Sequence, residues 1–155
     1  MNKAIIGYTG FVGSNLIEQT NFDDFYNSKN IESIKGKKYD LVVCAGASAV
    51  KWLANQEPIK DKENLQYLTD CLTNVSVNKL ILISTVDVYP NPLNVDEDSI
   101  IDHSILKPYG KHRWELENFV RNKFDSLIIR LPGLFGKGLK KIVIYDFLNE
   151  NIGEW

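Results

Sequence analysis

Three glycines recur at three-residue intervals near the start of the chain, directly after a short apolar run. Gly7, Gly10 and Gly13 stand in the segment GYTGFVGSNL, which follows KAII. Without a side chain in the way, such a turn brings backbone N–H groups close to a phosphate at the start of a helix. Gly7 would permit the turn, Gly10 would admit a pyrophosphate, and Gly13 would pack the helix against the strand. The pattern favours dinucleotide binding, and a tight connection without a ligand is the alternative.

Strands and helices must position this turn, and apolar runs predict where they lie. Runs of Ile, Val and Leu without polar alternation are typical of strands that helices cover on both faces. The predicted strands are residues 3–8, 41–45, 80–84 and 127–131, with a weaker one at 24–27. The predicted helices are residues 13–19, 58–75, 109–121 and 140–150. This alternation predicts an α/β fold, a doubly wound, Rossmann-like parallel sheet of about five strands in the order 2-1-3-4-5.

The connection between the second and third predicted strands is unusually short. Only eleven residues, 29–39, join them. A parallel crossover normally needs about a dozen residues or more, usually with a helix. We therefore expect a shortened crossover of irregular chain, and a switch point between the first and third strands.

Composition and charge exclude several classes of function. The chain has 155 residues, 44% of them apolar, and a net charge of −2. A folded chain of this size buries roughly 70% of its unfolded surface, so its core needs no disulfide or metal. Without a basic excess we expect no nucleic-acid partner. No apolar stretch approaches ~20 residues, so we expect no membrane partner either.

The cysteines and histidines show no metal-binding or disulfide pattern. Cys44 and Cys71 form no C-x-x-C pair, which favours a reducing, cytoplasmic location. His103 and His112 have no Cys, Asp or Glu partner at metal-ligand spacing, so we predict that they are surface or helix-flanking groups. We predict no metal site.

Several segments resemble one known family. The segment G-x-x-G-F-V-G-S-N-L is similar to the opening of extended short-chain dehydrogenase/reductases, the NAD-dependent epimerase/dehydratase family that acts on nucleotide sugars. Four later segments resemble that family in the same order: VVCAG at 42–46, STVDVY at 84–89, PYGK at 108–111 followed by Glu117, and RLPGLFG at 130–136. The five ordered matches cover most of the chain, and together they are specific.

The resemblance implies NAD or NADP as cofactor and identifies residues that would bind it. These residues are Gly7, Thr9, Gly10, Phe11, Val12, Gly13, Asn27, Ser28, Ala45, Gly46, Tyr109, Arg113 and Pro132. An acidic residue after the second strand would accept the ribose hydroxyls of NAD and repel the extra phosphate of NADP. This chain has Asn27, Ser28 and Lys29 there instead. Neutral donors and a lysine tolerate that phosphate, so these residues weakly favour NADP over NAD.

The resemblance also implies catalytic roles for Tyr109, Thr85 and Arg113. In the family a tyrosine is the general acid/base, a hydroxyl binds the substrate oxygen, and a lysine four residues after the tyrosine holds the ribose and stabilises the tyrosinate. Arg113 stands where this lysine is expected. It shares a helix face with Tyr109 and supplies a charge, but a guanidinium stays protonated and cannot relay a proton. One acid, Asp87, follows Thr85 where the dehydratases have two, which favours oxidation, reduction or epimerisation over elimination of water.

Two functions remain open. The first is an NAD(P)-dependent oxidoreductase or epimerase acting on a nucleotide-sugar-like molecule, with Tyr109 as acid/base. The second is a non-catalytic dinucleotide-binding module or redox sensor, which Arg113 favours. We expect residues 1–155 to form a single NAD(P)-binding domain in which the family's substrate-binding lobe is largely absent. In a homodimer, the second copy of the chain could supply the side of the substrate site that this lobe forms in the family.

Overall fold

A five-stranded parallel sheet organises the computed structural model, which describes residues 1–136 and 138. Its strands are β1 (Lys3–Ile6), β2 (Asp24–Tyr26), β3 (Lys38–Cys44), β4 (Ser76–Thr85) and β5 (Ser126–Leu131). They lie in the order β2-β1-β3-β4-β5, and each neighbouring pair is parallel. The predicted fold class and strand order are confirmed.

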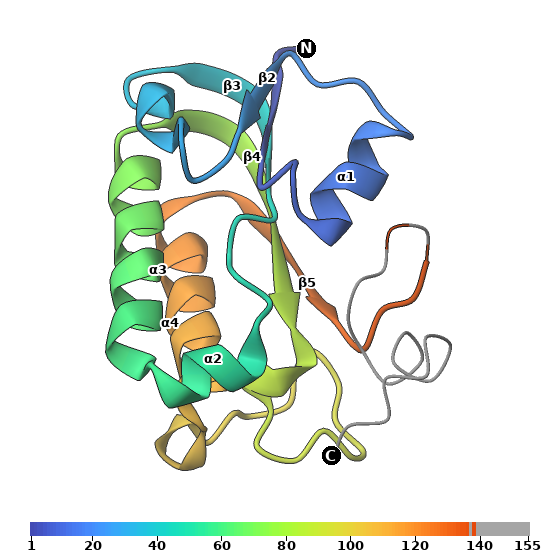
Figure 1. Ribbon diagram of the computed structural model, residues 1–155, viewed down its shortest axis with the longest axis vertical. Helices are drawn as coiled ribbons and strands as arrows, with labels where there is room; N and C mark the ends of the chain where they lie inside the picture. Colours follow the sequence, from blue (N-terminus) through green and yellow to red (C-terminus); the bar gives the residue numbers. More distant parts are fainter. Residues whose placement is uncertain (137, 139–155) are drawn as a thin grey trace.

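Helices cover the two faces of the sheet unequally. The helices are α1 (Phe11–Ile17), α2 (Lys51–Gln56), α3 (Pro58–Thr73) and α4 (Pro108–Lys123). Figure 1 shows α3 and α4 side by side on one face of the sheet and α1 on the other. Both α3 and α4 start with a proline in their first turn, where a missing N–H removes no hydrogen bond from the helix. The predicted helix over residues 140–150 lies outside the described residues.

Three short 3-10 turns complete the described secondary structure. They are η1 (Ile31–Ile34), η2 (Val86–Val88) and η3 (His103–Ile105). The crossover from β2 to β3 contains η1 and otherwise irregular chain, as expected for so short a connection. Ile31 and Ile34 are buried, so this turn replaces a crossover helix in covering the sheet.

The core lies between the sheet and the inner sides of α3 and α4. The helices contribute Leu65, Leu68, Leu72, Leu116 and Val120, and the strands contribute Val42, Cys44, Leu80 and Leu82. Each buried leucine contributes about 1.5–3 kcal/mol relative to an exposed one. This packing fixes the start of α4 relative to the ends of β3 and β4.

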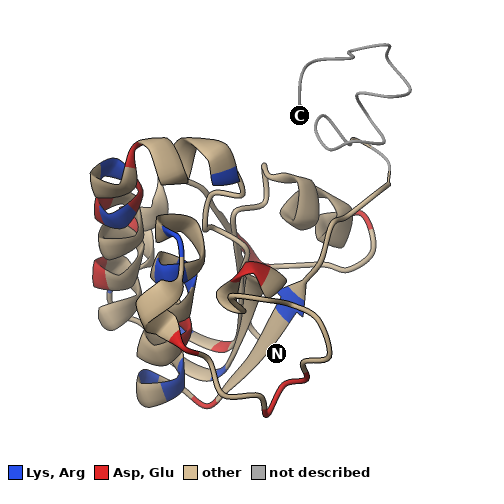
Figure 2. Ribbon diagram, turned by 90° about the horizontal axis from the view of Figure 1, so that it is seen from below, with Lys and Arg blue, Asp and Glu red and all other residues tan. Residues whose placement is uncertain are grey.

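The carboxyl ends of all strands meet at one edge of the sheet, which points downward in Figure 1. Ligands of open α/β sheets bind at this edge, near the switch point, here between β1 and β3. Figure 2 looks at the molecule from this side and shows acidic and basic residues interspersed along the helices. Within the described part of the chain, no helix is both long and apolar enough to cross a membrane.

Candidate functional site

The β1–α1 turn excludes side chains at two of its three glycines. Gly7 has a φ of +87°, and a Cβ built there would lie 2.2 Å from the carbonyl oxygen of Ala45. A Cβ on Gly13 would lie 2.2 Å from the carbonyl oxygen of Gly7. Gly10 is exposed, and the nearest atom to its Cβ would be the carbonyl oxygen of Gly7 at 3.3 Å. A side chain at Gly10 would therefore press against this carbonyl without overlapping it, and Gly10 itself leaves its backbone exposed to an approaching phosphate.

Neighbouring strand ends hold this turn at the switch point. The backbone N–H of Gly7 donates to the carbonyl of Tyr26 at 2.7 Å, and that of Ala45 donates to the carbonyl of Ile6 at 2.8 Å. The residues predicted at the ends of β1 and β3 therefore lie together, including Gly46, whose Cβ would meet the Ile6 side chain at 2.8 Å.

Asn27 and Ser28 follow β2 on the outer side of the same turn. The Asn27 amide donates to the Tyr8 hydroxyl at 3.3 Å, and its Oδ1 accepts from the backbone N–H of Lys29 at 2.9 Å. Ser28 and Lys29 are exposed. The groups that the sequence places beside the adenosine ribose are thus neutral or positively charged.

Tyr109 lies at the start of α4, next to the end of β4. A Cβ on Gly110 would lie 2.1 Å from the carbonyl oxygen of Asp87, so α4 begins in backbone contact with η2. The backbone N–H of Tyr109 also donates to Oδ1 of Asn55 at 2.9 Å. These contacts place the phenol beside the hydroxyl of Thr85, the last residue of β4.

The surroundings of Tyr109 keep its phenol protonated at neutral pH. Burial raises the pKa of Tyr109 above its usual value of 10, and the charge of Asp87 acts in the same direction. The charges of Arg113 and Lys51 and a hydrogen bond with Thr85 lower this pKa, but burial outweighs them. Tyr109 can therefore donate a proton to a substrate oxygen.

Arg113 is buried and largely occupied by groups of the protein itself. Its Nη1 donates to the carboxylate of Asp61, and its Nη2 donates to the carbonyl of Ser48 at 2.6 Å. Its Cζ lies 4.1 Å from the centroid of the Tyr109 ring. Its Nε is buried and has no hydrogen-bond partner among the described residues. Arg113 therefore holds a positive charge against Tyr109, and its buried Nε is without a partner among the described residues.

His112 is buried, so the prediction that it lies at the surface or flanks the helix is wrong. Packing of α3 against α4 brings its Nδ1 within 2.7 Å of Oδ2 of Asp61, the atom that also accepts from Arg113. Burial raises the pKa of Asp61, but the hydrogen bonds from Arg113 and His112 outweigh this and hold the pKa below its ordinary value of 3.8. Asp61 is therefore an ionised, buried anchor for both side chains.

Lys51 is a member of the site that the sequence analysis did not single out. It is the first residue of α2, and its Nζ donates to Oδ1 of Asp87 at 2.5 Å. The Thr85 hydroxyl donates to Oδ2 of Asp87 at 3.3 Å. Lys51 stands 36 residues before Asp87, in a helix of six residues without a clear apolar period, so no local pattern indicates the contact.

The end of β5 completes the edge. Leu131 pairs with Thr85 across the sheet, so the exposed Pro132 follows at the same level. Arg130, the residue before Leu131, donates to the buried carboxylate of Glu117 in α4 at 2.8 Å. The last strand is thereby tied to the helix that carries Tyr109.

Glu117 and Arg130 also anchor the loop that follows η2. Glu117 is completely buried and accepts a hydrogen bond from the Ser84 hydroxyl at 2.6 Å. Arg130 donates to the Tyr89 hydroxyl, which donates in turn to the carbonyl of Asp96 at 2.6 Å. This network connects β4, β5 and α4 with the loop beside the site.

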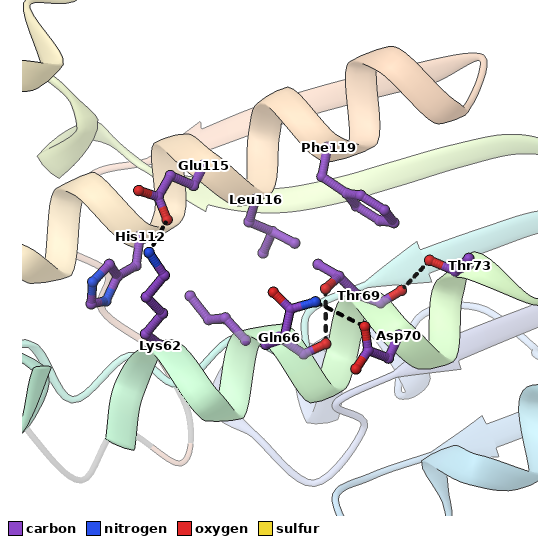
Figure 3. Close-up of a pocket in the computed structure, with 10 residues that line it drawn as sticks. Lys62, Gln66, Thr69, Asp70, Thr73, His112, Glu115, Leu116 and Phe119 are labelled. Atoms are coloured by element: carbon purple, nitrogen blue, oxygen red, sulfur yellow. Dashed lines mark hydrogen bonds and ion pairs between the residues drawn. The ribbon is translucent and has the colours of Figure 1, made fainter. Parts of the chain in front are cut away.

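A groove of about 190 Å³ lies elsewhere, between the outer sides of α3 and α4. Figure 3 shows polar side chains from both helices along it, including an ion pair of Lys62 with Glu115 and a hydrogen bond of Gln66 with Asp70. None of the residues predicted for the site lines this groove. This groove is therefore separate from the carboxyl edge of the sheet, where the predicted residues lie.

Comparisons with known proteins find similarity in structure and none in sequence. No protein-family model and no curated protein sequence matches the chain. Among solved structures, dTDP-4-dehydrorhamnose reductase from Bacillus anthracis, in complex with NADP, has a TM-score of 0.74 and 19% identity. The match covers 99% of this chain and 62% of that one.

Two epimerases are similar in the same way. UDP-glucuronic acid 4-epimerase from Bacillus cereus, in complex with NAD, has a TM-score of 0.68 and 16% identity over 97% of this chain and 62% of its own. UDP-glucose 4-epimerase from Thermotoga maritima, with UDP-glucose, has a TM-score of 0.62 and 19% identity over 84% and 55%. The chain thus shares the fold of these nucleotide-sugar reductases and epimerases and spans less than two thirds of their length.

Proposed function

We propose that the chain binds NAD(P) at the carboxyl edge of its sheet and acts as an oxidoreductase or epimerase on a nucleotide sugar. The observation that carries this proposal is the exposed backbone at Gly10, in a turn that excludes side chains at Gly7 and Gly13. A turn of bare backbone at the start of a helix lets a phosphate come close, because no side chain stands in its way. The shared fold of NADP- and NAD-bound reductases and epimerases supports the proposal.

The remaining site residues fit the rest of a dinucleotide. Ala45 and Gly46 follow β3 at the switch point, and Pro132 follows β5 on the same edge of the sheet, where the nicotinamide half would lie. Arg113 would act on the cofactor mainly through its positive charge beside Tyr109, because its guanidinium is buried and donates to Asp61 and to the Ser48 carbonyl. Bound NAD(P) would supply hydride transfer, and Asn27, Ser28 and Lys29 favour NADP over NAD because none of them is acidic.

In this reaction Tyr109 exchanges a proton with the substrate oxygen while Thr85 holds that oxygen by a hydrogen bond. A positioned acid/base of this kind contributes about 10²- to 10⁴-fold to a rate. Burial keeps Tyr109 protonated, so it is ready to act as the acid in a ketone reduction. The substrate class is inferred from the names of the neighbours, which include a UDP-glucose complex.

The test is the variant Tyr109→Phe, assayed with NADPH and NADH against a panel of nucleotide sugars and their keto forms. We expect turnover to fall by about 10²-fold or more, because the acid is gone, while NADPH affinity changes little. Tyr67→Phe is the matched control, since Tyr67 is exposed on α3. Its turnover should equal that of the unmodified chain.

Two results would contradict the catalytic proposal. Full turnover by the Tyr109→Phe variant would remove the acid/base role. NADPH binding by the unmodified chain without turnover of any substrate in the panel would leave the non-catalytic dinucleotide-binding module.

A further inference from the structure

The proposed reaction requires a proton path that Arg113 does not provide. Tyr109 gives up a proton in each ketone reduction and must regain one, yet its side chain is only 7% exposed. On one side of its ring lies Arg113, which stays charged at any relevant pH and is held by Asp61 and the Ser48 carbonyl. The proton must therefore reach Tyr109 from another side.

A second set of polar groups connects the neighbourhood of Tyr109 with solvent. The Thr85 hydroxyl lies beside the phenol and donates to Oδ2 of Asp87 at 3.3 Å. The backbone N–H of Asp87 donates back to the same hydroxyl at 3.1 Å, which fixes their relative position. Oδ1 of Asp87 accepts from Nζ of Lys51 at 2.5 Å. Exposure increases along this path, from 34% for the Asp87 side chain to 54% for that of Lys51.

We propose that Asp87 and Lys51 form the proton-exchange route between Thr85 and solvent, in place of the route that an active-site lysine on α4 would offer. The proposal rests on the proposed function, because it concerns the same reaction. It assigns a role in the site to Lys51 and makes Asp87 a proton carrier that acts through Thr85.

Each step of the route moves one proton. When a substrate oxygen takes the phenolic proton, the phenolate takes the hydroxyl proton of Thr85. In the same step the carboxylate of Asp87 takes a proton from the ammonium of Lys51 and passes it to the oxygen of Thr85. The Lys51 amine then regains a proton from hydronium or a buffer acid in solution. After a cycle each residue has its original protonation state, and solvent has supplied the proton. Oxidation of an alcohol runs the same steps in reverse.

The other polar and charged groups near Tyr109 do not offer an equivalent proton path. Asp61 is 7% exposed, and both His112 and Arg113 contact its Oδ2. Asn55 contacts the backbone of Tyr109 through its amide oxygen and carries no transferable charge. Of the described charged groups near Tyr109, the Lys51–Asp87 pair reaches both ends of the path: Asp87 contacts the Thr85 hydroxyl, and Lys51 is exposed to solvent.

The experiment removes each carrier and restores it from solution. In Lys51→Met and Asp87→Asn, measured in weakly buffered solution, we expect kcat to fall by about 100-fold while the Kd for NADPH stays the same. In Lys51→Ala and Asp87→Ala, which vacate the space of the removed groups, methylamine and formate respectively should restore kcat in a concentration-dependent way. A merely structural ion pair would not respond to these small molecules.

Lys62→Met is the matched control, because Lys62 is an exposed lysine that pairs with Glu115 across two helices. Its kcat should not change. Exposed ion pairs contribute about 1 kcal/mol or less to stability, so the Lys51 variant folds, and its thermal unfolding verifies this. An unchanged kcat in Lys51→Met, or a loss in Lys51→Ala that methylamine does not restore, would overturn the proton route. An unmodified chain that binds NADPH without turnover would instead overturn the proposed function on which the route depends.

Discussion

The three glycines of the β1–α1 turn look alike in the sequence but meet different surroundings. Gly7 and Gly13 face backbone atoms at 2.2 Å from a would-be Cβ, whereas a Cβ on Gly10 would lie 3.3 Å from the Gly7 carbonyl oxygen. The spacing alone predicts the turn, a packing role for Gly13 and close approach of a ligand at Gly10. The atoms that exclude a side chain at Gly7 belong to Ala45, after the end of β3, and only the fold brings them there.

Substituting Gly13 by alanine tests the packing role. The added Cβ would overlap the Gly7 carbonyl, so we expect a loss of about 1–3 kcal/mol in the free energy of unfolding. Gly10→Ala should cost about 1 kcal/mol or less, because the φ of this N-cap residue is ordinary and its Cβ would press on the Gly7 carbonyl oxygen at 3.3 Å without overlapping it. Urea unfolding of both variants measures the difference. Equal losses would contradict the division of roles.

Asp61→Asn tests the buried anchor of Arg113. Removing the charge leaves the buried Arg113 without its counter-ion, so we expect a loss of about 3–5 kcal/mol at pH 7. The folded pKa of Asp61 lies below 3.8, so its contribution is fully present above about pH 4 and is lost as pH falls through that folded pKa. The stability difference between the variant and the unmodified chain should therefore shrink on acidification.

Urea unfolding at a series of pH values from 7 to 3 measures this difference. Asp70→Asn is the control on the same helix, because Asp70 is exposed. A difference for Asp61→Asn that stays constant over the pH range would contradict the assigned charge state.

At the scale of elements, sequence pattern was sufficient where a segment is long and regularly apolar. The strand 127–131 and the helix 58–75 were predicted to within a few residues of β5 and α3. The six-residue α2 was missed because its sequence, KWLANQ, carries no clear apolar period. The pairs that join elements, such as Asp61 with His112, lie 51 residues apart and depend on how α3 packs against α4.

Glu117→Gln tests the network that joins β4, β5 and α4. Glu117 is fully buried and accepts hydrogen bonds from Ser84 and Arg130, so its neutral analogue leaves Arg130 without its counter-ion. We expect a loss of about 3–5 kcal/mol in the free energy of unfolding. Glu115→Gln, a change in the more exposed Glu115 of the same helix, should cost about 1 kcal/mol or less. Similar losses from both variants, measured by urea unfolding, would argue against the network.

At the scale of the whole molecule, topology brings the predicted residues to one edge. Strand order 2-1-3-4-5 follows from the sequence pattern, and it places the ends of β1, β3, β4 and β5 next to one another. The glycine turn, Thr85 and Tyr109 therefore lie along the same edge of the sheet although they are far apart in sequence. The resemblance identified these residues, whereas the occupation of Arg113 by Asp61 and the contact of Lys51 with Asp87 follow from tertiary packing.

A titration with NADPH, NADP⁺, NADH and NAD⁺, followed by thermal unfolding, tests the central claim most directly. A ligand at 100 times its Kd adds about 2.7 kcal/mol to the stability of the protein that binds it. We predict stabilisation of the unmodified chain, strongest with an NADP form. Gly10→Val should fold but lose this response, because its side chain occupies the surface that the diphosphate requires. Absence of a response to all four dinucleotides, or an undiminished response in Gly10→Val, would contradict the account.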